Sequence, residues 1–318
     1  METFNLLPYC ETNDIFRVSF DFYTPRPQFV IIPTEIESID PEFCAMSAEQ
    51  TCILIDTVRS VMSCFRIPEG ILSIHRGSWK SRPAKSFHCH LCVHAERYLE
   101  IFERKKKGIP NWPSVAYVTR QWGWNKDPRS YAQNVRGYPY KSRFKEDVSG
   151  VLELIQDSSR RESLGTRMPQ DDACSQATDS SHPSPIPSPH NPKPSPQALL
   201  GNCLTKVVYH PSHPKIGFVG KKNACVYELH EMLWAIENFA RAYGLTDTET
   251  DDKNYGCHVC LYFGPAPSDW KFSGETTSEY DIMGYLVTTG PRFYQLCPAE
   301  HRQSWFDEFQ RSNFKCFT

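Results

Sequence analysis

The sequence predicts an α+β fold in which an antiparallel sheet carries a long helix, and a second half of the chain repeats part of this plan. Residues 1–150 read as strand, strand, helix, strand, strand, and residues 201–318 contain a strand, helix, strand series. The chain has 318 residues, which is more than one core usually organises. We therefore expect two folded regions.

The first region opens with two strands, Ile15–Phe22 and Gln28–Pro33, in which β-branched and aromatic residues dominate. The intervening turn TPRP predicts a hairpin. Apolar residues at helical spacing then predict a helix over Met46–Phe65, with Ser47 as its N-cap. Two further strands, Ile71–Ser78 and Ser86–His94, are expected after Pro68 and Gly70.

The second region contains a predicted strand at GFVG, a helix over Val226–Tyr243 and a strand over Tyr255–Phe263. The string Cys257–Leu261, CHVCL, resembles Cys89–Val93, CHLCV, and both strings follow a helix. An internal duplication is one explanation, and chance similarity between two short strings is the other.

Residues 151–200 are predicted to be a disordered linker. Between Gln156 and Gln197 large apolar side chains are almost absent, and seven prolines fall between positions 183 and 196. Such a composition does not bury enough apolar surface to offset the entropy of ordering.

Composition narrows the class of protein. Hydrophobic residues make up 40% of the chain and aromatics 13%, which excludes a wholly disordered protein. The thirteen cysteines are an odd number spread along the chain, and the N-terminus lacks the order of a secretory signal. Free thiols in the cytoplasm or nucleus are expected. No apolar run reaches the ~18–20 residues of a membrane helix, so we expect no membrane partner.

The segment FHCHLCVH at 87–94 concentrates the chemistry of the chain. Alternate residues of a strand share a face. One face is expected to carry His88, His90, Cys92 and His94, and the other Cys89, Leu91 and Val93. The face with Cys89, Leu91 and Val93 suits a hydrophobic core. The imidazoles and the thiol on the other face need polar partners if they are buried.

These residues resemble the signature of the histidine triad superfamily, His-φ-His-φ-His-φ-φ with φ apolar. The similarity extends over residues 13–102, through a strand ending in proline, a linker, a long helix and two strands. The resemblance implies that His90 is a nucleophile that attacks a nucleotide α-phosphate without a metal, and that His88 orients it or holds phosphate oxygens. Cys92 stands in place of the third histidine, and a thiol is a poor substitute for a donating imidazole.

A second register is also open, in which His90, Cys92 and His94 are the three positions and a cysteine replaces the nucleophile. Such a protein would be inactive. In the second half His258 would match His90, but Gly256 and Cys260 flank it, so that copy is expected to be non-catalytic. Two such domains in one chain resemble the tandem arrangement of the galactose-phosphate uridylyltransferase branch.

Phosphate chemistry needs cationic or donating groups around the nucleophile. The neighbouring strand and loop offer His75, Lys80, Arg82, Lys85 and Ser86, and His94 lies on the histidine strand itself. The alternative is that these are ordinary strand-end and solvated loop residues.

Metal binding is a rival interpretation, and no other cofactor is expected. His88, His90 and Cys92 could share a zinc ion, and CxxC strings occur at 89–92 and 257–260. Cysteines at i and i+3 of a strand point to opposite faces, however, and this geometry argues against a zinc knuckle.

The segment from Arg104 to Lys145 carries eleven Lys and Arg residues against one acid, interleaved with aromatic residues. This pattern is typical of surfaces that bind single-stranded nucleic acid by phosphate neutralisation and base stacking. The candidate contacts are Lys105, Lys106, Lys107, Arg120, Trp122, Trp124, Arg129, Arg136 and Tyr138. A solvated helix end and core tryptophans are the alternative.

The sequence thus predicts a protein that binds a nucleotide or an RNA phosphate, with nucleotidyl hydrolysis or transfer at His90. The alternatives are an inactive scaffold that binds nucleic acid or partner proteins, and a zinc-binding module. A protein partner would use the linker or the second region.

Overall fold

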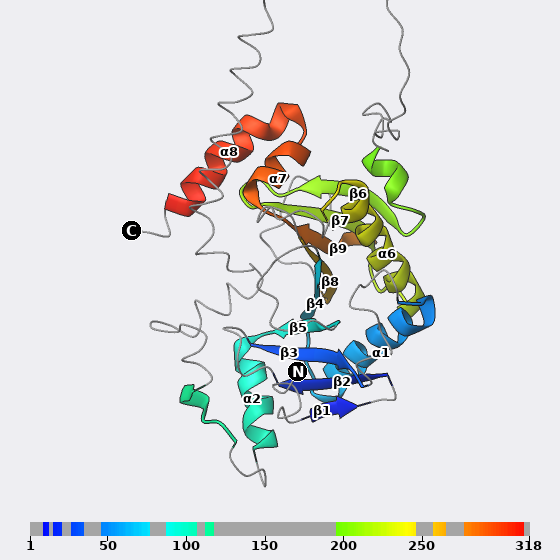
Figure 1. Cartoon of the computed structure of the whole chain (residues 1–318), viewed down its shortest axis with the longest axis vertical. Helices are drawn as coiled ribbons and strands as arrows, with labels where there is room; N and C mark the ends of the chain where they lie inside the picture. Colours follow the sequence, from blue (N-terminus) through cyan, green and yellow to red (C-terminus); the bar gives the residue numbers. More distant parts are fainter. Residues whose placement is uncertain are drawn as a thin grey trace, which may run out of the picture.

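The computed structural model describes residues 9–12, 15–20, 27–34, 46–76, 87–106, 112–117, 195–245, 257–264 and 277–314. It has the predicted α+β class. The nine strands of these described residues form one antiparallel sheet in the order β1-β2-β3-β5-β4-β8-β9-β7-β6 (Figure 1). Residues of both predicted regions therefore belong to a single sheet, in which β4 and β8 are direct neighbours.

The first half contains the five elements that the sequence predicts and two that it does not. Its elements are β1 (Tyr9–Thr12), β2 (Phe16–Phe20), β3 (Gln28–Pro33), α1 (Ala48–Cys64), β4 (Gly70–Arg76), β5 (Cys89–Val93) and α2 (Ala95–Lys105). The additional elements are β1 and α2. Helix α2 buries Tyr98, Ile101 and Phe102, which follow the i, i+3, i+4 spacing of an amphipathic helix.

The second half follows the same chain order. Its elements are η3 (Pro196–Leu199), β6 (Leu204–Tyr209), β7 (Lys215–Lys221), α6 (Val226–Ala242), β8 (Cys257–Phe263), β9 (Tyr280–Val287), α7 (Gly290–Leu296) and α8 (Ala299–Phe314). The prediction that the linker extends to residue 200 is wrong at its end. Residues 196–199 form the short 3-10 helix η3, and Leu200 is fully buried.

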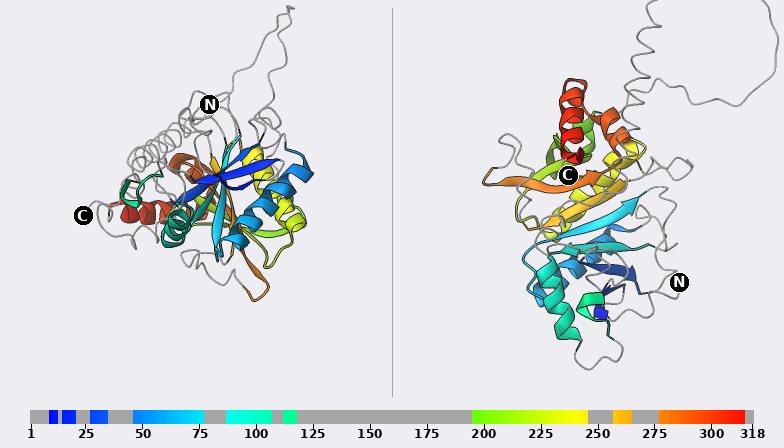
Figure 2. Two further views of the ribbon diagram at one scale, coloured as in Figure 1. Left: turned by 90° about the horizontal axis from the view of Figure 1, so that it is seen from below. Right: turned by 90° about the vertical axis from the view of Figure 1, so that its left-hand side faces the viewer.

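The two halves repeat one strand order toward the middle of the sheet. The first half runs β2-β3-β5-β4 and the second runs β6-β7-β9-β8. In each half a long helix connects the second strand to the innermost one, and a helix follows the last strand. The innermost strands β4 and β8 lie side by side (Figure 2). Their register runs from Gly70 opposite Phe263 to Arg76 opposite Cys257.

The ends of α1 and α6 are built alike, although their sequences differ. Each helix begins with a capping box, formed by Ser47 with Gln50 in α1 and by Cys225 with Glu228 in α6. Each ends in a Schellman motif, in which a residue with positive φ allows a backbone N–H to reach back to the carbonyl five residues earlier, Ile67 to Met62 and Leu245 to Ala240. The residue with positive φ is Arg66 in α1 and Gly244 in α6.

This plan corrects the predicted match between the two CxxC strings. The string at 89–93 forms β5, which precedes α2 and corresponds in strand order to β9. The string at 257–261 lies in β8, whose counterpart is β4. The two strings therefore occupy different places in the repeated order, and His258 does not correspond to His90.

The main core lies on one face of the sheet, under the helices. Helices α1 and α6 contact each other across the junction of the halves and cover this face together (Figures 1 and 2). The buried side chains of Cys89, Leu91 and Val93 join this core, as predicted. A second cluster on the other face consists of strand residues. This second face also carries His90, because Leu91 and Cys89 point to the first.

Two polar contacts connect the two halves of the chain on the sheet face that α1 and α6 cover. Arg76 of β4 donates from Nε to Glu237 Oε1 of α6 at 2.8 Å, and its Nη2 lies 2.7 Å from the same oxygen. Both side chains are buried. Arg59 of α1 donates to the Ala224 carbonyl oxygen at 2.6 Å. The ion pair is a constraint on register, since β4 and α6 must stay aligned to keep both charges partnered.

No helix in the described part of the chain has the length and apolar character needed to span a bilayer. The cysteines whose side chains are described are free thiols.

Replacing Arg76 by Met should lower the free energy of unfolding by about 3–5 kcal/mol, because the Glu237 carboxylate would lose its guanidinium partner in a buried site. Urea denaturation at pH 7 measures this loss. The matched control is Arg311→Met, which removes an exposed arginine paired with Glu308 and should cost less than about 1 kcal/mol. Equal effects of the two substitutions would contradict the assigned role of Arg76.

His210, at the turn between β6 and β7, should make the protein sensitive to acid. Burial, with the nearby His213 and Lys215, lowers the pKa of His210 to about 2. Its Nδ1 accepts hydrogen bonds from the backbone N–H groups of Ser212 and His213, at 3.2 and 3.1 Å. In the unfolded chain this imidazole takes up a proton near pH ~6.5, whereas in the folded chain it stays neutral. The contribution of His210 to the free energy of unfolding is therefore fully present above pH ~6.5 and is lost as the pH falls below it.

Lowering the pH from 7 to 5 should therefore remove about 2 kcal/mol of stability through His210. In His210→Asn the amide oxygen replaces the Nδ1 acceptor and the titration disappears. Denaturant titrations at pH 7 and pH 5 measure the free energy of unfolding of both proteins. Between these pH values the variant should lose about 2 kcal/mol less stability than the parent protein. An unchanged acid sensitivity would exclude His210 as its source.

Candidate functional site

Strand β5 brings two histidines together on the sheet face opposite the helices. His90 lies within β5 and His88 directly precedes it, so their side chains share a face. The two rings are edge to face with centroids 5.3 Å apart. Both residues are half-buried. The predicted pairing of His88 and His90 on one surface is therefore present.

A second histidine pair adjoins the first and joins the two halves of the chain. His75 of β4 and His258 of β8 are opposite one another in the antiparallel register. The Nδ1 atom of His75 is 3.3 Å from Nε2 of His258, and the ring centroids are 4.8 Å apart. His258 Nδ1 is 3.3 Å from Ser73 Oγ. We call His75, His88, His90 and His258 the histidine cluster.

The register explains why these side chains meet. His90 is opposite Ser73, Ser73 is opposite Cys260, and Cys260 is opposite Tyr285. Directly opposed residues of antiparallel strands point to one face, with Cβ atoms about 4.5–5.5 Å apart. A row of polar side chains therefore crosses β5, β4, β8 and β9 at the junction of the halves. The Cys260 thiol donates to Ser73 Oγ at 3.7 Å within this row.

The row ends on β9, in the second half of the chain, among buried aromatic side chains. The rings of Tyr262 and Tyr285 lie 5.1 Å apart, and burial raises the pKa of the Tyr285 phenol well above its ordinary value. Lys215 places its ammonium group 5.6 Å from the centroid of the Tyr285 ring. The phenol stays protonated at neutral pH and, at 1% exposure, belongs to the packed interior of this face.

Cys92, in place of the third histidine, does not share the polarity of His88 and His90. It is 4% exposed and belongs to the apolar cluster on this face. Its thiol donates to the Gln28 side-chain oxygen at 3.6 Å. A buried neutral thiol with this partner is poorly suited to donate to a phosphate.

His94 does not continue the row, which corrects the expectation that it lies beside Cys92. Strand β5 ends at Val93, and His94 is the N-cap residue of α2. Its Nε2 contacts the Glu69 carboxylate. A carboxylate on this imidazole disfavours an anion at the same place.

Most of the other predicted contacts lie outside the described residues. These are Lys80, Arg82, Lys85 and Ser86 of the predicted phosphate site, and Lys107, Arg120, Trp122, Trp124, Arg129, Arg136 and Tyr138 of the predicted nucleic-acid surface. Of the remainder, Lys105 and Lys106 form the end of α2, and the Lys105 ammonium lies 5.4 Å from the Phe65 ring centroid.

Trp112, which belongs to the same aromatic segment, packs into the core. Its ring centroid is 4.9 Å from that of Phe102 and 5.4 Å from that of Phe20. This tryptophan is therefore a structural residue rather than a base-stacking one.

The described residues contain no group of three or more His, Cys, Asp or Glu side chains arranged to hold a metal ion. The cysteines of each CxxC string point to opposite faces of the sheet, as their spacing predicts. Cys89 and Cys257 belong to the core under the helices, and Cys92 and Cys260 to the other cluster.

Comparison of the chain with protein-family models, with curated proteins and with solved structures finds no match.

Sequence reasoning missed two components of the site, Ser73 and the placement of His258. Ser73 lies two residues before His75 in a predicted strand, so period-two alternation could have assigned it to the same face. The approach of His258 has no local signal, because it results from pairing between strands that are more than 180 residues apart.

Replacing His258 by Leu should destabilise the fold by about 1–3 kcal/mol, because His75 and Ser73 each lose a buried hydrogen-bonding partner. Equilibrium unfolding in urea measures the effect. His301→Leu, on the exposed surface of α8, is the control and should stay close to the parent protein. A stability equal to that of the control would mean that the contacts of His258 are dispensable.

Proposed function

We propose that the protein binds the phosphate of a nucleotide or of RNA on the histidine cluster, and that His90 acts there as a nucleophile in nucleotidyl hydrolysis or transfer. The observation that carries the proposal is the half-buried pair of His88 and His90, with ring centroids 5.3 Å apart, beside the His75–His258 pair. The half-buried His88 and His90 would supply a hydrogen-bond donor for phosphate oxygens and a nucleophile. His258, whose ring nitrogens lie against Ser73 and His75, would position His75 beside them.

The order of elements also supports the relation to the histidine triad superfamily. Strand β3 ends at Pro33, α1 follows, and β4 and the histidine strand β5 come next, in the order that the resemblance implies. The matching strand order of the two halves favours a tandem arrangement of two such units. We include both the family relation and the duplication in the proposal.

In the proposed reaction a neutral ring nitrogen of His90 attacks the α-phosphorus. A nitrogen–phosphorus bond forms as the bond from phosphorus to the leaving oxygen breaks, and the leaving group takes up a proton from solvent. Water or another hydroxyl then attacks the phosphorus and returns a proton to solvent, and the nitrogen–phosphorus bond breaks to leave His90 neutral again. His88, edge to face with His90, would orient its ring and hold a phosphate oxygen.

A binding protein without turnover is the second candidate. The buried Cys92 favours it, because no third imidazole follows His88 and His90 on the strand to donate to the phosphate. Residues 107–111 and 118–145 of the predicted nucleic-acid surface lie outside the described residues. The proposal of RNA as the ligand therefore rests only on the positive charge and the aromatic content of that part of the sequence.

Purified protein incubated with adenosine phosphoramidate, dinucleoside polyphosphates and cap analogues should turn over at least one of them, and His90→Ala should reduce the rate by about 10³-fold or more. Chromatographic separation of the products measures turnover. His301→Ala, an exposed histidine of α8, is the matched control and should keep the parent rate.

The same experiment separates the two candidates when ligand binding is measured in parallel by filter retention. Binding without turnover by the parent protein would favour the binding protein. Neither turnover nor saturable binding of any of these compounds, or of single-stranded RNA, would contradict both.

A further inference from the structure

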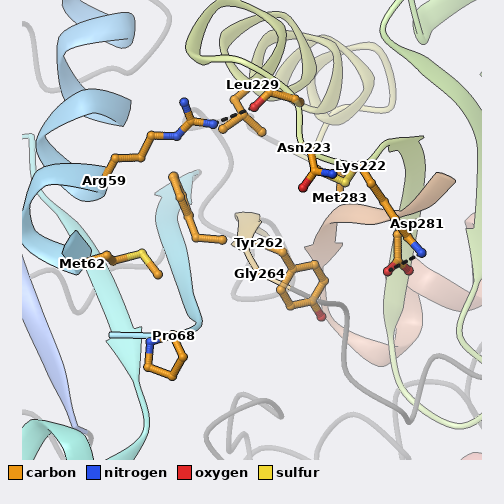
Figure 3. A pocket seen from close by; sticks show the side chains of 12 residues that line it. Arg59, Met62, Pro68, Lys222, Asn223, Leu229, Tyr262, Gly264, Asp281 and Met283 are labelled. Carbon is orange, nitrogen blue, oxygen red and sulfur yellow. Dashed lines mark hydrogen bonds and ion pairs between the residues drawn. The ribbon is translucent and has the colours of Figure 1, made fainter. Parts of the chain in front are cut away.

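A cavity of about 490 Å³ lies where the two halves meet, away from the histidine cluster. Its walls come from α1, from the turn between β7 and α6, from the first turn of α6, and from the ends of β8 and β9 (Figure 3). The helices α1 and α6 cover the sheet face opposite to His90. The volume is within the range of about 300–1,000 Å³ that is typical of small-molecule sites.

The greater part of the cavity wall is apolar. It is formed by Met62, Pro68, Leu229, Phe263 and Met283. Methionine side chains adapt their shape to a flat or branched apolar ligand because they are unbranched and polarisable. Met62 and Met283 stand on opposite sides of the cavity in Figure 3, so a ligand between them would contact a thioether from each half.

Arg59 brings a charge to this apolar space. Its guanidinium donates through Nη2 to the Ala224 carbonyl oxygen at 2.6 Å, and no carboxylate in the described part of the chain forms an ion pair with it. The two other charged side chains at the cavity, Lys222 and Asp281, neutralise each other, because Lys222 Nζ is 3.9 Å from Asp281 Oδ2. Lys222 Nζ also donates to the Thr277 carbonyl oxygen at 2.8 Å. The cavity therefore carries one uncompensated positive charge.

We propose that this cavity binds a small apolar molecule that carries one carboxylate. The planar fork of a guanidinium matches a carboxylate with two parallel hydrogen bonds, and the remaining donors of Arg59 are available for it. The apolar body would lie between Met62 and Met283. This site is separate from the proposed phosphate chemistry, because it borders the Tyr262–Phe263 end of β8, whereas His258 lies at the other end of that strand.

Two probes of equal shape test the proposal by isothermal titration calorimetry on the full chain. 1-Naphthoate carries the carboxylate, and 1-naphthalenemethanol carries a neutral hydroxyl on the same ring system. The parent protein should bind 1-naphthoate at one site per chain, at least about tenfold more tightly than the alcohol. In Arg59→Met this preference should disappear, while the affinity for the alcohol changes less than about threefold.

The control is Arg241→Met, which removes an exposed arginine of α6 and should leave both affinities unchanged. Arg59→Lys keeps the charge without the planar fork and should retain an intermediate preference. Equal affinities of the parent protein for the two probes, or no saturable binding of 1-naphthoate at millimolar concentration, would overturn the proposal. The comparison of the two probes on the parent protein needs no variant. It therefore tests the proposal even if Arg59→Met does not fold.

Discussion

The pairing of β4 with β8 is the constraint on which the rest of the structure depends. It makes one sheet from strands of two distant parts of the chain, in a register that runs from Gly70 opposite Phe263 to Arg76 opposite Cys257. The same register aligns α1 with α6 and closes the buried pair between Arg76 and Glu237. A slip of one residue would turn every side chain of one half to the wrong face.

The candidate site and the cavity both result from this junction, toward opposite ends of β8. On one face the register brings His258 to His75 and Ser73, beside the rings of His88 and His90. At the Tyr262–Gly264 end of β8, both halves border the cavity next to α1 and α6. Neither half supplies all the side chains of either site. If both sites are functional, the two halves act as one unit rather than as independent domains.

Local patterns in the sequence predict local elements well. Ser47, the apolar spacing in 48–64 and Pro68 were enough to define α1, and alternation was enough to assign His88 and His90 to one face. The pairing of β4 with β8 could not be predicted in this way, because it follows from long-range packing. The match between the CxxC strings was misleading for the same reason: similar strings on β5 and β8 serve different positions in the strand order.

In the proposed site, imidazoles from both halves of the chain form one binding surface for phosphate. Long-range ¹H–¹⁵N spectra of the histidine side chains, recorded while AMP is added, test it most directly. We expect the ring nitrogens of His75, His88, His90 and His258 to shift together with one binding constant, while those of the exposed His301 stay in place. Shifts confined to His88 and His90, or equal small shifts of all histidines, would contradict a site shared between the halves.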